Sequence, residues 1–297
     1  MMKRNVVKQS VSMIMAVLLF LGAAGVNAPV QVHAQQKSEA VSETALKPII
    51  IQAPMPIEGE HFAQRLKHVK VEKSGSFIFW IGTLDDYPVI VMKTGKGMEN
   101  SAAATAIAIE RYHPIAIINQ GTSGGHDASL NVYDIVLGRR TTNIGSFKTP
   151  ELAEGKGSDP MKWIPMDLLA SEGSAGEDPN AEKIRYFDGD QKLLAAANAV
   201  KHKYTKGKVV EGTIGSADTW NNEIDRIKWF HEKFGTSVEE MEGASAAQIA
   251  GSYNVPLLVI RILSNNKVNQ GKYNPNTAAA NQEYVFEVVK QYISMIK

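Results

Sequence analysis

Two acidic segments of the chain carry side chains suited to acid–base chemistry on a small molecule. Glu58 directly follows an apolar run, and residues 238–247 place Glu239, Glu240 and Glu242 ahead of a run of small residues. Ligands of parallel sheets bind beyond the carboxyl ends of the strands, where a carboxylate that follows a strand comes to lie. Glu242 is surrounded by small residues that pack closely, so we expect it to be buried with a polar partner. Glu239 is expected to be a solubilising group, and the alternative for Glu58 is a solvated helix start.

A glycine-rich segment, residues 121–125, follows another short apolar run and admits two interpretations. Its letters GTSGG match the GxSxG pattern of a serine-hydrolase nucleophile at Ser123, but a loop follows where that motif requires a helix. Glycines at the end of a strand also let backbone N–H groups approach the oxygen atoms of a ligand. We favour this second interpretation and keep the serine nucleophile as an alternative.

The composition excludes several classes of protein. Cysteine is absent, which excludes a disulfide scaffold, a thiolate metal site and a cysteine nucleophile. The 7 histidines show no HExxH or HxH spacing and no Walker A sequence occurs, so we expect no metal and no organic cofactor. Lys plus Arg number 32 against 31 Asp plus Glu, a balance that favours a small neutral ligand over nucleic acid.

The N-terminal residues predict export. Basic residues precede an apolar stretch at 13–24, and small residues stand at the positions that precede a cleavage site after Ala34. We interpret residues 1–34 as a signal peptide, residues 35–46 as a flexible spacer and residues 47–297 as the folded domain. The mature protein is then secreted or extracytoplasmic and has no stable membrane anchor. The alternative is an uncleaved membrane helix, which polar residues and a proline at the outer end of the stretch oppose.

Strands alternate with helices over the rest of the chain. Apolar runs predict strands at residues 48–53, 77–84, 87–92, 115–119, 135–137, 209–214 and 257–263. Helical spacing predicts helices at residues 100–112, 192–204, 224–234, 241–253 and 278–296. This alternation predicts an α/β fold, a single-domain three-layer α/β/α sandwich with a central mixed sheet. Asn100 is the expected N-cap of its helix. Residues 149–182 have no strong period and are expected to form a surface excursion that lies over a site.

Several of these segments together resemble a known family. Residues 49–297 resemble the bacterial nucleoside phosphorylase and nucleosidase superfamily, and within it most resemble the 5'-methylthioadenosine/S-adenosylhomocysteine nucleosidases. The segments that carry the resemblance are Met55 with Glu58, the turn at 95–100, Asn119 to Gly125, Asp134 to Val136, Ser216 to Trp220, Glu240 to Glu242, and Arg261 to Asn265.

The resemblance implies hydrolysis of the N-glycosidic bond of a purine nucleoside, such as 5'-methylthioadenosine or S-adenosylhomocysteine, with release of adenine. It also implies a homodimer that needs no cofactor. Cleavage leaves positive charge on the sugar, so the site needs a base for water and groups that hold the ribose. By resemblance Glu58 is the catalytic base, and Asn265 stands where the family has an aspartate that protonates the purine. The substrate-binding residues implied are Thr122, Trp220, Glu240, Met241 and Glu242.

Two asparagines distinguish this chain within the superfamily. Asn119 stands where the relatives that use phosphate carry an arginine, which favours water over phosphate. Asn265 is an amide and cannot donate a proton at neutral pH, although it can pair with the N6 and N7 edge of adenine. Two alternatives therefore stay open: a purine nucleoside phosphorylase acting on 6-oxopurine nucleosides, and a non-catalytic nucleoside-binding or storage protein.

Overall fold

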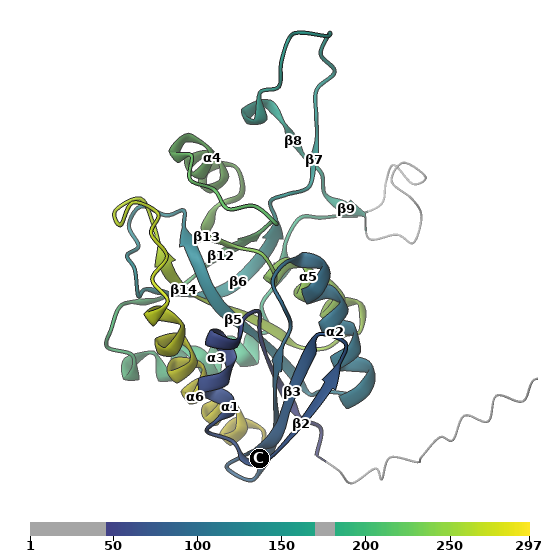
Figure 1. The fold of residues 1–297 in the computed structure, drawn as a ribbon, viewed down its shortest axis with the longest axis vertical. Coiled ribbons are helices and arrows are strands. Elements are labelled where there is room, and N and C mark those ends of the chain that lie inside the picture. Colours follow the sequence, from purple (N-terminus) through teal and green to yellow (C-terminus); the bar gives the residue numbers. More distant parts are fainter. Residues whose placement is uncertain (1–45, 170–181) are drawn as a thin grey trace, which may run out of the picture. The chain divides into compact units, whose positions relative to one another are not determined.

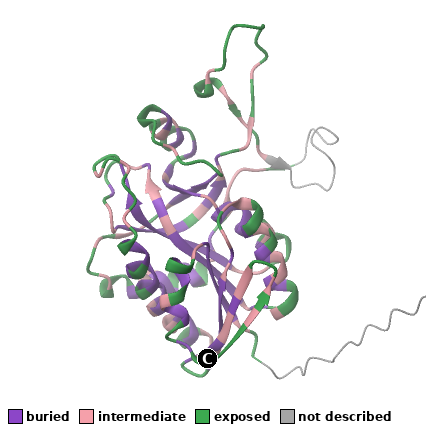
Figure 2. Ribbon diagram, in the orientation of Figure 1, coloured by how far each residue is buried: buried purple, intermediate pink, exposed green. Residues whose placement is uncertain are grey.

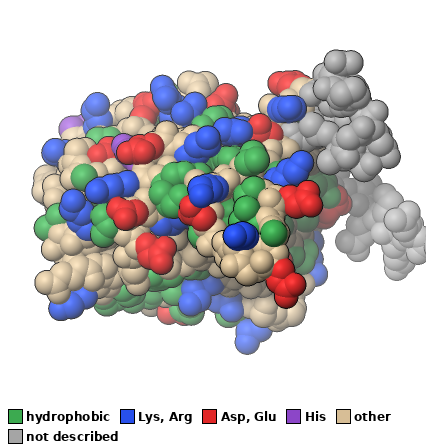
Figure 3. All heavy atoms as spheres, turned by 90° about the horizontal axis from the view of Figure 1, so that it is seen from above, with side chains coloured by type: hydrophobic (Ala, Val, Ile, Leu, Met, Phe, Trp, Pro, Cys, Tyr) green, Lys and Arg blue, Asp and Glu red, His purple; other side chains and the backbone are tan. Residues whose placement is uncertain are grey.

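The structure, a computed structural model, describes residues 46–169 and 182–297. The predicted signal peptide at 1–34 lies outside these residues, as does all but the last residue of the predicted spacer at 35–46. None of the helices in the two described ranges combines the length and the apolar composition of a membrane span. Basic and acidic side chains are interspersed over the face seen in Figure 3, in keeping with the net charge of +1.

A mixed sheet forms the centre of the fold (Figure 1). Its strands are β1 (Ile49–Ala53), β2 (Lys67–Ser74), β3 (Phe77–Leu84), β4 (Tyr87–Lys93), β5 (Ala116–Gly125), β6 (Ile135–Asn143), β11 (Phe187–Asp188), β12 (Val209–Ser216), β13 (Thr236–Glu240) and β14 (Leu257–Asn265). Their order is β11-β6-β12-β13-β5-β1-β4-β3-β2, and β14 pairs with both β5 and β6. Strands β5, β13, β12, β6 and β14 therefore close into a ring, while β1, β4, β3 and β2 continue as an open sheet.

Helices cover both faces of this sheet. Helices α1 (Pro56–Ala63), α3 (Gln191–Val200) and α6 (Asn276–Ile296) pack on one face, and α2 (Met98–Tyr112) and α5 (Gly243–Ser252) pack on the other. Successive strand residues point to opposite faces, so Ile49 and Ile51 join the first cluster of buried side chains and Ile50 joins the second. Figure 2 shows most of the sheet buried between helices with exposed outer sides. The predicted three-layer α/β/α sandwich is confirmed.

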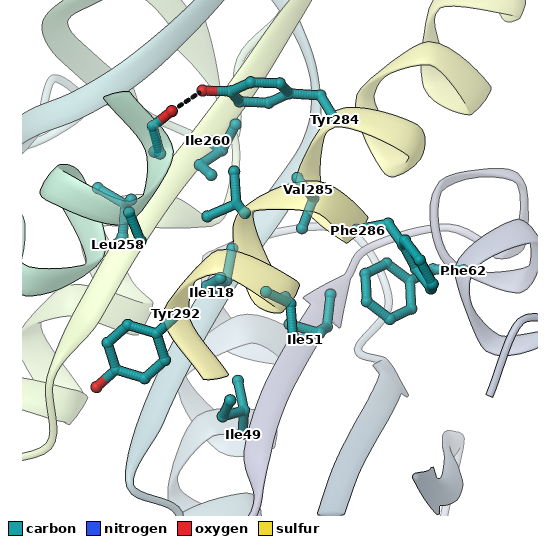
Figure 4. Close-up of a cluster of buried hydrophobic side chains, with 14 of the residues drawn as sticks. Ile49, Ile51, Phe62, Ile118, Leu258, Ile260, Tyr284, Val285, Phe286 and Tyr292 are labelled. Carbon is teal, nitrogen blue, oxygen red and sulfur yellow. Dashed lines mark hydrogen bonds between the residues drawn. The ribbon is translucent and has the colours of Figure 1, made fainter. Parts of the chain in front are cut away.

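Helix α6 fixes the first of these layers against the strands. Val285, Phe286 and Tyr292 lie on its buried face over Ile49 and Ile51 (Figure 4). The buried hydroxyl of Tyr284, also on α6, donates a hydrogen bond of 2.8 Å to the carbonyl of Ala197 in α3. This bond connects two helices of the same layer. Burial of such side chains supplies most of the stabilisation of a cysteine-free domain, at roughly 25 cal/mol per Å² of apolar surface.

Several elements differ from the sequence prediction. Strands β2 and β13 are additional, and β5 continues through the glycine-rich segment, whereas a strand ending at Asn119 was expected. The glycines fit inside the sheet because β13 and β14 approach β5 from either side. Helix α2 begins at Met98, and the side chain of Asn100, the predicted N-cap, donates instead to the carbonyl of Lys96 at 2.7 Å. The predicted strands at 77–84 and 87–92 are confirmed as β3 and β4, which form a hairpin whose turn residues Asp85 and Asp86 both have positive φ.

The surface excursion predicted at 149–182 is anchored on helix α4 (Ile224–Phe234). Arg226 of α4 donates a hydrogen bond of 2.6 Å to the carbonyl of Pro160, and the Trp163 ring lies 5.9 Å from that of Phe147. The described part of the excursion contains a 3₁₀ turn (Pro160–Lys162) and the short strands β8 (Ile164–Pro165) and β9 (Leu168–Leu169), which pair with β7 (Phe147–Lys148) and β10 (Lys183–Ile184). None of its described residues lines the cavity described below, so these do not cover a site as expected.

Candidate active site

One cavity of about 290 Å³ opens at the carboxyl ends of the parallel strands β1, β5 and β14. This is the edge at which ligands of α/β proteins bind. All seven residues predicted from the sequence as site residues line it: Glu58, Thr122, Trp220, Glu240, Met241, Glu242 and Asn265. We call Glu58, Thr122 and Glu242 the Glu58 end of the cavity, and Trp220, Glu239 and Asn265 the Asn265 end.

Glu58 is buried and held by hydrogen bonds from two directions. It lies in the first turn of α1, which begins at Pro56, and its Oε2 accepts from the backbone N–H of Met55 at 3.1 Å. Its Oε1 accepts from both the N–H and the hydroxyl of Thr122, each at 2.8 Å. Burial raises the pKa of this carboxyl, while the Thr122 hydrogen bonds and the Arg261 charge act in the opposite direction. A fixed carboxylate of raised basicity is suited to accept a proton, and the solvated alternative does not hold.

Glu242 is the second buried carboxylate of the Glu58 end. Its Oε1 accepts from the N–H of Gly97 at 2.9 Å, and its Oε2 lies 3.5 Å from Nη2 of Arg261. Gly97 has φ of +97°, and a side chain there would touch Asp218 at 3.0 Å, so this N–H contact depends on glycine. Burial and the neighbouring Glu240 charge raise the pKa of Glu242 to about 8. The expectation that Glu242 is buried with a polar partner is confirmed.

Glu240 and Arg261 form a buried pair beneath the cavity. Glu240 accepts from Nη2 of Arg261 and from the Ser216 hydroxyl, and it also accepts from the N–H groups of Glu242 at 3.0 Å and Gly243 at 2.8 Å. Both of its oxygens are therefore held inside the protein, whereas the sequence predicts a contact with substrate. These partners arise because the chain turns from β13 directly into α5, which points the first N–H groups of that helix at the carboxylate.

Asn119 lies behind the cavity and not in its lining. It is fully buried, its Oδ1 accepts from Nη2 of Arg261 at 2.7 Å, and its Nδ2 donates to Oε1 of Gln52 at 3.0 Å. The guanidinium of Arg261 is thus committed to Asn119 and to Glu240. Among the described residues that line the cavity, Lys96 is the one cationic side chain, and it is exposed.

Asn265 marks the other end of the cavity. Its Oδ1 accepts from the hydroxyl of Ser264 at 2.8 Å, and it is 7% exposed. The neighbouring Asn266 has a different use, since its Nδ2 donates to the carbonyl of Leu130 at 3.0 Å and its Oδ1 accepts from the N–H of Val268 at 3.0 Å. The position that faces the cavity is therefore 265, while Asn266 shapes the loop that follows β14.

Glu239 is not the solubilising group that the sequence predicts. It is only 9% exposed and lines the cavity, its Oε1 accepts from the N–H of Asn221 at 3.0 Å, and its Oε2 lies 3.1 Å from Nε2 of the buried His126. The expectation failed because strand β13 was not predicted, and within a sheet this side chain meets a neighbouring strand in place of solvent. The alternation of Val238 with its polar neighbours is the available signal for that strand.

Trp220 and Ser123 differ in their positions relative to the cavity and the sheet. Trp220 is 49% exposed at the edge of the cavity, with its indole N–H donating to Oδ1 of Asn222 at 3.2 Å. Ser123 lies inside strand β5 and its hydroxyl donates to the carbonyl of Ile262 at 3.1 Å. No strand-to-helix turn exposes Ser123, so the serine-hydrolase alternative is not supported. Across residues 46–169 and 182–297, no group of three or more acidic or histidine side chains is placed to hold a metal.

Known proteins share this fold and part of the sequence. The 5'-methylthioadenosine/S-adenosylhomocysteine nucleosidase of Bacillus cytotoxicus is 28% identical over 233 residues, which cover 76% of this chain and 91% of that protein. A structure of the nucleosidase of the same name from Colwellia psychrerythraea, in complex with adenine, has a TM-score of 0.66 at 27% identity and covers 83% of this chain and 96% of that one. The Neisseria meningitidis nucleosidase with methylthio-immucillin-A has the same TM-score at 24% identity, covering 82% and 99%.

The family model named the phosphorylase superfamily matches residues 48–294, nearly the whole described chain. The match includes every strand of the central sheet and every residue of both ends of the cavity. The family resemblance inferred from the sequence is thereby confirmed. The chain belongs to the phosphorylase superfamily, and it is an enzyme of the hydrolase kind found among its nucleosidase relatives.

Proposed function

We propose that this protein hydrolyses the N-glycosidic bond of a purine nucleoside, of which 5'-methylthioadenosine and S-adenosylhomocysteine are the first candidates. One observation carries the proposal: the buried Glu58, fixed by Thr122, shares its cavity with the buried Glu242. The names of the relatives supply the candidate substrates.

Glu58 and Glu242 have different roles at the sugar. Glu58 takes a proton from water as the water oxygen bonds to C1' of the ribose, and the electron pair of the bond to the base leaves with the base. Glu242 accepts hydrogen bonds from ribose hydroxyls and faces the positive charge that develops on the sugar. That charge favours the ionised form of Glu242, whose pKa is about 8 in the protein alone. Met241 and Trp220 are proposed to pack against the sugar and the base.

Water, and not phosphate, is the proposed nucleophile. A phosphate ion needs cationic or N–H ligands, preferably a guanidinium that can pair with two of its oxygens. The Arg261 guanidinium is committed to Glu240 and Asn119, and Lys96 stands exposed at the edge. The arrangement therefore supports hydrolysis over phosphorolysis.

Product analysis tests the proposal directly. The purified protein is incubated with 5'-methylthioadenosine, S-adenosylhomocysteine, adenosine and inosine, each with and without phosphate, and the free base and the sugar are quantified. We expect base release that is independent of phosphate, and its loss in Glu58→Gln but not in Glu60→Gln, since Glu60 is exposed and outside the cavity. Sugar phosphate formed only with phosphate would identify a phosphorylase, and saturable binding without any release would identify a binding protein.

We also propose that the enzyme acts outside the cytoplasm, as a homodimer, after removal of residues 1–34. The basic, apolar and small-residue segments of the N-terminus support export. N-terminal sequencing of the protein recovered from its native compartment is expected to begin at Gln35. Recovery of the uncleaved chain from the membrane fraction would contradict the proposal, and sedimentation of the mature protein as a monomer would contradict the dimer.

A further inference from the structure

The Asn265 end of the cavity contains a titratable pair that the steps above do not use. Oε2 of Glu239 lies 3.1 Å from Nε2 of His126, although the angle is not that of a hydrogen bond. Nδ1 of His126 lies 2.7 Å from the Thr236 hydroxyl, and the ring stacks on Phe230 with centroids 5.7 Å apart. The His126 side chain is 1% exposed, so its Nε2 is a buried polar atom directed at this carboxylate.

Strand register brings Glu239 beside Asn265. Gly124 of β5 pairs with Glu239 of β13 on one side and with Asn265 of β14 on the other. A methyl group placed on Gly124 would lie 3.2 Å from Nδ2 of Asn265 and 3.6 Å from Oε1 of Glu239. The amide and the carboxylate therefore flank one point in the wall of the cavity, and only the absence of a side chain at 124 lets both approach it.

Every carboxylate in the cavity lining has partners, and Glu239 itself accepts hydrogen bonds from the N–H and from Nδ2 of Asn221. Glu58 is held by Thr122, Glu240 is held by Arg261, and Glu242 is held by the N–H of Gly97. What distinguishes Glu239 is its position: among the described lining residues it is the acidic group opposite Gly124 together with Asn265, whose amide cannot supply a proton.

A second cavity gives this group a route to solvent. It has a volume of about 280 Å³ and shares Gly124, Glu239 and Asn265 with the first cavity. Asn221, Asn266 and Lys267 are among its other lining residues, which makes its wall largely polar and suited to water. Water in this second cavity can therefore reach Glu239.

We propose that Glu239, positioned by His126, supplies the proton to the departing base in place of the residue at 265; this inference rests on the proposed function. As the bond from C1' to the base breaks and its electron pair moves onto the base, the carboxylic acid of Glu239 gives its proton to a ring nitrogen of the base. The attacking water gives its own proton to Glu58. After the products leave, Glu58 loses that proton to solvent and Glu239 regains one through the second cavity, so the enzyme returns to its starting state.

The test compares Glu239→Gln, Asn265→Asp and the double variant on two leaving groups. With 5'-methylthioadenosine or inosine, Glu239→Gln is expected to lower kcat by at least about 100-fold with little change in KM. With 4-nitrophenyl riboside, whose leaving group departs without a proton, the same variant is expected to stay within about threefold of the native protein, because only general acid catalysis is lost. Adding Asn265→Asp to Glu239→Gln is expected to restore at least about tenfold of the lost purine release. His126→Gln should show a smaller loss of the same kind, and Glu60→Gln should show none.

Four results would overturn this assignment. Full purine release by Glu239→Gln would remove any role for the carboxyl group, and an equal loss on both leaving groups without rescue by Asn265→Asp would assign Glu239 to structure alone. In both of these results the native protein releases base, so the role of Glu239 fails and the proposed function stands. If the native protein releases no base while Asn265→Asp does, the native site lacks an acid, so the role of Glu239 and the proposed hydrolysis by the native protein both fail. If neither protein releases base from any nucleoside, the proposed function fails with it.

Discussion

The two ends of the cavity are held in place by different parts of the protein. At the Glu58 end, Glu58 and Glu242 are fixed by the backbone N–H groups of Met55, Thr122 and Gly97. At the Asn265 end, the contacts are mostly between side chains, such as Ser264 with Asn265 and His126 with Glu239. Contacts to the backbone are set by the fold, whereas contacts between side chains change with single substitutions. Under the proposed mechanism, attack on the sugar and release of the base would therefore be carried by separable sets of residues.

Glu58→Gln breaks the Glu58 end and has the largest effect that we predict. Base release is expected to fall by about 10³-fold or more, because glutamine keeps the shape but cannot take a proton from water. The change is measured as kcat for base release with the substrate found by product analysis. Adenine binding, which concerns the other end, should be nearly unchanged. Full activity in this variant would show that another group activates water.

Arg261→Met tests the support beneath the cavity. Loss of the Arg261 guanidinium leaves the carboxylates of Glu240 and Glu242 without their cation. We therefore expect the free energy of unfolding to drop by about 3–5 kcal/mol. Urea denaturation measures this value, and Arg261→Met combined with Glu240→Gln should recover part of it. An unchanged midpoint would mean that solvent reaches this pair.

Glu242→Gln tests the Glu58 end through the pH dependence of the stability of the protein. The pKa of Glu242 is raised from 4.5 to about 8 in the folded protein. Between these values the folded state holds a proton that the unfolded state has released, so the contribution of Glu242 to stability falls as pH rises and is fully lost above about 8. Because glutamine does not titrate, the stability of Glu242→Gln relative to the native protein should increase by more than about 1 kcal/mol from pH 5 to pH 9. Parallel stability curves for the two proteins would contradict the raised pKa.

Trp220→Phe tests the Asn265 end of the cavity, and its effect on adenine affinity is the smallest change that we predict. Adenine is expected to quench the tryptophan emission of the native protein, and this quench should disappear in the variant. Since a ring still packs on the base, affinity should fall by less than about tenfold, in line with 0.5–1.5 kcal/mol for an aromatic contact. A persisting quench would assign the signal to Trp80, Trp163 or Trp229.

The sequence predicts the Glu58 end better than the Asn265 end, because the patterns that mark the Glu58 end lie within short stretches of sequence. Glu58 follows an apolar run within a few residues, and Glu242 begins a run of small residues, so both patterns are visible in single stretches of sequence. The predicted alternation of strands and helices likewise depends on neighbouring residues, which is why the central sheet and its two helix layers are confirmed.

The pairing of Glu239 with His126 depends on contacts that no single stretch reveals. His126 follows β5, Glu239 lies in the five-residue strand β13, and 112 residues separate them in the chain. A strand this short has too few residues to establish a two-residue period against the background of a polar loop. The same limit explains why Asn119 and Arg261 gave no sign of their buried contact with each other, although each was identified from its motif.

The ring of strands also sets the order in which the enzyme is completed during synthesis. Strand β14 joins β5 and β6, contributes Arg261 and Asn265, and comes last among the strands in the chain. Pairing of β14 with β5 links residues 140 positions apart, as between Leu257 and Ile117, so the ring cannot close before β14 has been translated. A nascent chain that ends before Leu257 has neither a closed ring nor the cation beneath the cavity. No competent enzyme can therefore exist before β14 has been translated.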